Sequence, residues 1–246
     1  MSCKPVPLAM HRGPPYNIIA NQMNTAAIKT QGFIFAFYHY SHSPRKSIIE
    51  TIVSVATSSD CIHVAILPVP HCIMQRNEKK EDCILEIIAE KYVYTAFIGL
   101  GFEKQQTTSI LNEAYEFLFV PVTLKKFREG LMFLESLDGA GYNYIDLPLT
   151  ILPKKFKKRS HSWHYFGGTG NNPDEDEKCC TPSKVFCSQV GLILCYKCDI
   201  FREDDKAKML DPSYCSPGEL FKMLSPAYHP LAYPCSMEKI KTAPES

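Results

Sequence analysis

Short apolar segments, rich in aromatic and β-branched side chains, recur along the first half of this chain and constrain its fold more than any other feature. They lie at residues 32–40, 60–68, 83–89, 92–100 and 115–122. Segments of this length and composition are typical of buried strands, and brief polar turns between several of them favour antiparallel pairing. We therefore expect an α+β fold with a mostly antiparallel sheet.

Helical periodicity occurs in three other parts of the sequence. Ile48, Ile52 and Val53 have helical spacing after a Ser-Pro start, and residues 123–137 place apolar side chains along another helix before glycines end it. The third segment, Lys184–Lys197, is apolar enough for a buried helix, and its start is open. It begins either after Thr181-Pro182 or at Cys187 itself.

The length of 246 residues and a hydrophobic content of 45% allow one sizeable core, and we expect one domain at residues 31–225. Prolines in residues 1–30 indicate an extended N-terminal arm that could contact a protein partner. Residues 153–180 change from a basic to an acidic cluster and are interpreted as an insertion loop. Residues 226–246 are predicted to be a C-terminal tail.

The charge balance gives no reason to expect binding to a polyanion. The formal net charge is +1, and the basic run Lys154–Arg159 is short enough to be a solvated surface, so a nucleic-acid partner is not expected. No apolar stretch approaches the ~20 residues of a membrane span, and the N-terminus lacks a continuous apolar signal region. The expectation is an intracellular, cytoplasmic protein that needs no cofactor.

Cysteine is unusually frequent, with 11 residues in the chain. In a reducing compartment most should be free thiols. Cys195 and Cys198 form a CxxC pair, but no second pair lies at zinc-finger spacing, so no metal site is predicted. A zinc-stabilised binding module built on the C-terminal cysteines is kept as an alternative.

Cys187 is the candidate nucleophile. If its helix starts at this residue, the thiol meets the positive end of the helix dipole and unpaired backbone N–H groups. These groups favour thiolate and can hold an oxyanion. We therefore predict a Cys187 pKa well below that of free cysteine, provided that an imidazolium lies beside it.

Short motifs in the chain resemble those of the NlpC/P60 family of papain-like cysteine hydrolases. Phe186–Val190 is similar to the family's nucleophile motif, and Cys61–Ile66 resembles the strand that carries its catalytic histidine. The histidine strand precedes the cysteine helix here, as in the circularly permuted branch. Glu86, Gly141–Tyr144 and the Ser-Pro-Gly segment within Asp211–Phe221 agree with that order.

The resemblance implies a permuted papain-like NlpC/P60 fold, in which the sheet packs against the nucleophile-bearing helix. It implies acyl transfer from an amide, ester or thioester of an acyl or peptide substrate. Cys187 would be the nucleophile and His63 the general base, within hydrogen-bond reach or slightly beyond, with Glu86 orienting the imidazole. Tyr144 and Ser188 are predicted to line the substrate pocket.

The composition also resembles that of permuted members found in large DNA viruses. A catalytically idle scaffold, or a virion component that binds protein, is the alternative to an enzyme.

Overall fold

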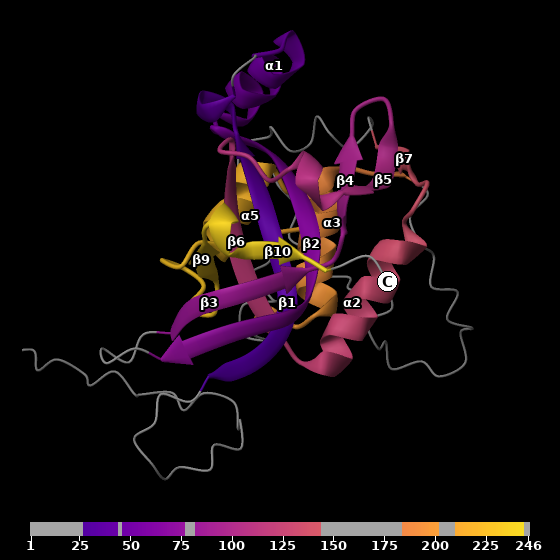
Figure 1. Ribbon diagram of the computed structural model, residues 1–246. Coiled ribbons are helices and arrows are strands. Elements are labelled where there is room, and N and C mark those ends of the chain that lie inside the picture. Colours follow the sequence, from indigo (N-terminus) through magenta and orange to yellow (C-terminus); the bar gives the residue numbers. More distant parts are fainter. Residues whose placement is uncertain (1–26, 44–45, 77–81, 144–183, 202–209, 244–246) are drawn as a thin grey trace, which may run out of the picture.

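A strongly twisted sheet forms the centre of the structure, a computed structural model that describes residues 27–43, 46–76, 82–143, 184–201 and 210–243 (Figure 1). The strands are β1 Ile28–His39, β2 Cys61–Arg76, β3 Asp82–Ala89, β4 Tyr92–Phe97, β5 Gly101–Gln106, β6 Tyr115–Val122, β7 Gly141–Tyr142, β8 Lys184–Val185, β9 Tyr233–Cys235 and β10 Ile240–Thr242. The α-helices are α1 Ile48–Thr57, α2 Leu124–Ser136, α3 Cys187–Lys197 and α5 Pro217–Leu224. Predictions on residues 1–26, Tyr144 and the 153–180 insertion fall outside the described residues.

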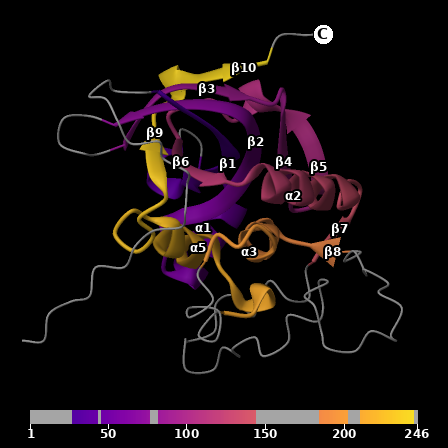
Figure 2. The same cartoon turned by 90° about the horizontal axis from the view of Figure 1, so that it is seen from below.

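The main sheet has the strand order β10-β3-β2-β1-β6-β9, and β4 and β5 branch from β2. Its pairs are antiparallel apart from β10 with β3. Helices α3 and α5 lie along one face of the sheet, with α2 beside them (Figure 2). The predicted α+β class and mostly antiparallel sheet are confirmed.

The central strand β1 is buried on both faces, which explains its nearly continuous apolar sequence. Phe33, Phe35 and Phe37 point toward the helices, whereas Ile34 and Ala36 belong to the core on the opposite face. All of these side chains are fully buried. Strand alternation therefore supplies two cores from one strand.

The C-terminal segment is part of the sheet, so the predicted tail and the domain end at residue 225 are wrong for this region. β9 pairs with β6, and β10 lies parallel to β3 at the sheet edge (Figure 2). The predicted N-terminal arm also overlaps β1, which starts at Ile28. Strands as short as β9 and β10 form because the existing sheet offers them unpaired edges.

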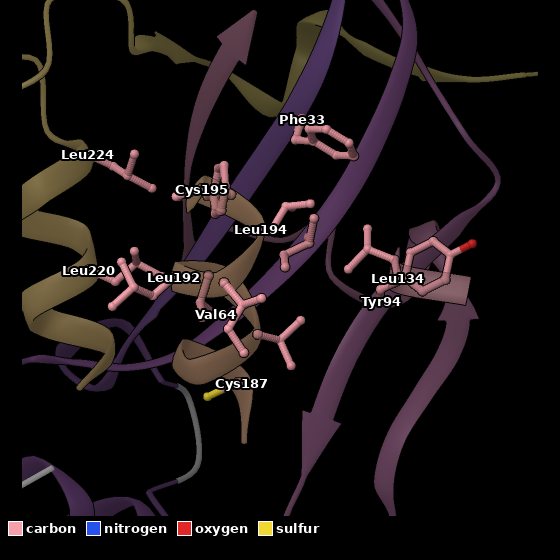
Figure 3. Packing of buried hydrophobic residues seen from close by; sticks show 14 of the residues in the cluster. Phe33, Val64, Tyr94, Leu134, Cys187, Leu192, Leu194, Cys195, Leu220 and Leu224 are labelled. Atoms are coloured by element: carbon pink, nitrogen blue, oxygen red, sulfur yellow. The ribbon is translucent and has the colours of Figure 1, made fainter. Parts of the chain in front are cut away.

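Helix α3 starts at Cys187, in agreement with one of the two starts considered. Phe186 is extended, and its backbone N–H donates to the Gln189 side chain at 3.3 Å. Every residue of α3 from Cys187 to Tyr196 is buried. A helix that is apolar all round is typical of a core position, and here the sheet, α2 and α5 pack against it. Figure 3 shows Val64 of β2 and Leu220 of α5 beside its side chains.

Gly130 of α2 allows close approach between α2 and α3. A Cβ at this position would lie 2.7 Å from Cys198 Sγ and Phe33 Cζ, and 2.9 Å from Leu194 Cδ1. Contacts this short require the packed neighbours to move.

We expect Gly130→Ala to lower the free energy of unfolding by about 1–2 kcal/mol, because overpacking outweighs the helix propensity that alanine adds. Urea denaturation measures the change. Met132→Ala, at a 70% exposed position of the same helix, is the control and should change stability little. Equal or greater stability of Gly130→Ala would show that the two helices separate easily.

Candidate functional site

A cavity of about 440 Å³ lies where the ends of several strands meet the start of α3. Helix α1 contributes Glu50, Val53 and Thr57 to its wall, and its N-cap residue Ser47 also lines the cavity. The sheet and α3 contribute, among others, Tyr38, Ile62, His63, Ala96, Phe97, Tyr115, Phe186, Cys187 and Ser188. Figure 1 shows α1 projecting beyond this end of the sheet.

Cys187 is the first residue of α3, and its side chain lies next to Val64 of β2 (Figure 3). Backbone groups of Val64 and Ser188 hydrogen-bond the sulfur and favour its thiolate form. Burial acts more strongly in the other direction and raises the pKa of Cys187 to about 11. The predicted lowering of this pKa does not occur, because desolvation outweighs the hydrogen bonds and the imidazole of His63 is neutral.

His63 lies near the start of β2 and is held by β4. Its Nε2 is 2.7 Å from Thr95 Oγ1, and its ring stacks on Phe97 with centroids 4.8 Å apart. Burial lowers the pKa of His63 to about 4, so the imidazole is neutral at pH 7. Its other nitrogen, Nδ1, has no hydrogen bond to any described residue. It is not one of the polar atoms that are buried without a hydrogen-bond partner.

The register of β1 against β2 separates His63 from Cys187. Phe37 pairs with Val64 on the helix face, so His63, which pairs with Tyr38, points to the opposite face. Among the described residues, no hydrogen bond joins the Cys187 thiol to the imidazole, so the predicted direct contact does not form. The two side chains nevertheless line the same cavity at the end of the sheet.

Glu86 does not orient His63. It pairs across the sheet with Ile73, ten residues beyond His63 along β2, which at ~3.3 Å per residue is far outside contact distance. Its carboxylate accepts a 2.6 Å hydrogen bond from Lys241 of β10, and this pairing lowers the pKa of Glu86. The predicted role is wrong, and Thr95 occupies the orienting position instead.

The remaining predicted pocket residues have different outcomes. Ser188 lines the cavity, but its hydroxyl is buried and donates to the Cys215 carbonyl at 2.7 Å, which ties α3 to the segment before α5. Tyr144 is outside the described residues. Thr95 was not predicted, although a lone polar residue within the apolar segment 92–100 is a sequence signal for such a contact.

His39 is a buried histidine on the helix face of β1, opposite Cys61. Its Nδ1 is 3.2 Å from Asp60 Oδ2, and its Nε2 is 3.4 Å from Glu116 Oε2 without hydrogen-bond alignment. Asp60 also accepts from the Ser41 backbone and hydroxyl, so the cluster anchors the turn after β1. His39 does not line the cavity.

The part of the chain that the structure describes contains no group of three or more His, Cys, Asp or Glu side chains placed to hold a metal ion. None of its helices is long and apolar enough to cross a membrane. Comparison with family models, curated proteins and solved structures finds no match for this chain.

The raised pKa of Cys187 predicts a specific alkylation profile. With a pKa of about 11, the thiolate fraction at pH 7 is only ~10⁻⁴, so its reaction with iodoacetamide should accelerate about tenfold per pH unit from pH 7 to 10. Mass spectrometry of the Cys187 peptide measures the rate. Free cysteine in the same buffers should level off near its pKa of about 8.5. A plateau for Cys187 below pH 8 would contradict the neutral resting thiol.

The lowered pKa of His63 predicts acid sensitivity of folding. The unfolded state takes up the imidazole proton at about pH 6.5, whereas the folded state resists it until about pH 4, so stability is complete above 6.5 and falls toward 4. His63→Gln should remove about 2–3 kcal/mol of this loss between pH 7 and 4.5. Urea denaturation across this range tests it. Parallel stability curves for the two proteins would contradict the assignment.

Proposed function

We propose that this protein is a cysteine hydrolase or acyltransferase, with Cys187 as nucleophile and His63 as general base. One observation carries the proposal: a helix-start thiol contacted by backbone groups shares a cavity with a neutral imidazole whose Nδ1 is open. The substrate is an amide, ester or thioester that enters this cavity. The permuted papain-like NlpC/P60 architecture is part of the proposal, supported by the order of the His63 strand before the Cys187 helix.

The resting pair is neutral, so the mechanism begins from a thiol. As Cys187 Sγ forms a bond to the carbonyl carbon, the thiol proton moves to His63 Nδ1 through a cavity water. The imidazolium then protonates the leaving group, and the carbon–leaving-group bond breaks to give a thioester. Water attacks the thioester, gives its proton to His63, and the thiol is restored with release of the acid.

Three features of the described residues support this mechanism. Thr95, bonded to Nε2, fixes the imidazole so that Nδ1 is left for proton transfer. The backbone N–H groups at the start of α3, which begins at Cys187, provide donors for a developing oxyanion. The cavity of about 440 Å³ has room for a small acyl group and a water molecule.

A second candidate function is a catalytically idle scaffold that retains this architecture and binds protein. The observation in its favour is that His63 points away from the face of β2 that the helices cover, together with 6% exposure of Cys187. Under this alternative the cavity has no acyl chemistry.

Acyl-probe labelling distinguishes the two functions. A small activated thioester should acylate Cys187, and mass spectrometry of the peptides should locate the acyl group on this residue. His63→Ala should slow acylation at least ~100-fold, because general-base assistance is lost. Thr95→Val should slow it about 10-fold through loss of imidazole orientation.

Glu86→Gln is the matched control, since Glu86 pairs with Lys241 away from the cavity, and its rate should equal that of the unaltered protein. If Cys187 is acylated no faster than the other cysteines, or if His63→Ala has no effect, the enzyme proposal fails and the scaffold is favoured.

A further inference from the structure

Helix α1 exposes an apolar stripe to solvent. Ile48 is 81% exposed, Ile52 60% and Val55 74%, although buried positions are typical of such side chains. Their spacing of four and three residues places them on one side of the helix. Glu50, Val53 and Thr57 of the same helix line the cavity, so α1 separates the cavity from its own apolar stripe.

The turn between β4 and β5 is a second apolar projection at the same cavity. Leu100 is 69% exposed and Ile98 38%, and Ile98 also lines the cavity. Gly99 between them has φ of 92°, and nothing lies within 4 Å of the position its Cβ would take. Figure 1 shows this turn and α1 at the same end of the molecule.

We propose that this end of the molecule docks on a lipid surface. The docking surface, here named the apolar rim, consists of Ile48, Ile52, Val55, Ile98 and Leu100. Its side chains insert among the acyl chains at the boundary with the headgroups, as those of interfacial helices do.

The size of the rim favours lipid over a second protein copy. A stable dimer buries about 800 Å² on each partner, whereas a helix of this length is only ~15 Å long and presents a narrow stripe. The rim is also divided between a helix and a turn. Acyl chains adapt to two separate projections, while a rigid partner requires a complementary surface around both.

The charges near α1 agree with insertion driven by apolar contact. Glu50 is the charged residue within α1, and its carboxylate accepts a 2.7 Å hydrogen bond from the Ser47 backbone in the capping box. Lys46, just before the helix, lies over the Tyr40 ring at 4.6 Å. Together with Asp60 after the helix, the described charges on and beside α1 form no basic cluster, so docking should occur on zwitterionic lipid and depend weakly on salt.

Co-sedimentation of the full chain with phosphatidylcholine vesicles tests the proposal. We expect the unaltered protein to bind, and the variant Ile48→Ser/Ile52→Ser/Val55→Ser to partition at least ~10-fold less, because the apolar area available for insertion is lost. Leu100→Ser should reduce partitioning about 3-fold by itself. Met132→Ser, at an equally exposed apolar position on α2, is the matched control and should bind like the unaltered protein.

Several results would overturn the proposal. They are absence of binding by the unaltered protein, equal binding by the rim variants, and binding that requires phosphatidylserine and disappears at high salt. Analytical ultracentrifugation tests whether a second copy of the chain packs against the apolar rim instead. A dimer that the α1 variant converts to a monomer would assign the rim to that contact. Circular dichroism of each variant confirms that the fold is kept.

Discussion

Burial of α3 from Cys187 to Tyr196 is the constraint on which the rest of the structure depends. The helix presents apolar side chains on every side, so the sheet, α2 and α5 must all pack against it. Close packing explains why glycines lie at its contacts: Gly130 of α2 lies against Leu194, and within α3 a Cβ at Gly191 would meet Leu220 of α5 at 2.5 Å. The Ser188 hydroxyl then satisfies the Cys215 carbonyl inside the core.

The same burial decides the chemistry at the start of the helix. A helix dipole stabilises an adjacent anion by about 0.3–1 kcal/mol, up to ~2 in favourable geometry. Raising the pKa of Cys187 from 9.0 to about 11 corresponds to ~2.7 kcal/mol against the thiolate, after the helix-start hydrogen bonds have acted. The lowered pKa of His63 likewise favours the neutral form of its side chain. A neutral thiol with a neutral base therefore replaces the ion pair expected from the motif.

Helix α1 has a different status from α3, because it packs on one side only. A helix of ten residues is marginal in isolation, so its local contacts matter. The Ser47–Glu50 capping box closes its first turn, and the Tyr40 and Thr51 hydroxyls bond at 2.9 Å. These contacts hold α1 over the cavity while its apolar stripe stays exposed. The same helix therefore lines the candidate site and carries the exposed apolar surface.

The sequence by itself determined the elements whose signals are local. Aromatic and β-branched runs predicted β1 and the start of β2, a Ser-Pro start and helical spacing predicted α1, and the apolar segment after Phe186 predicted α3. Only the tertiary structure decided which elements meet. The pairing of His63 with Tyr38 sets the face of His63, and Lys241, 155 residues from Glu86, takes the carboxylate assigned to that histidine. Strand register and long-range pairing depend on the packing of the whole core, because shifting a strand by one residue reverses every side chain without changing its local pattern.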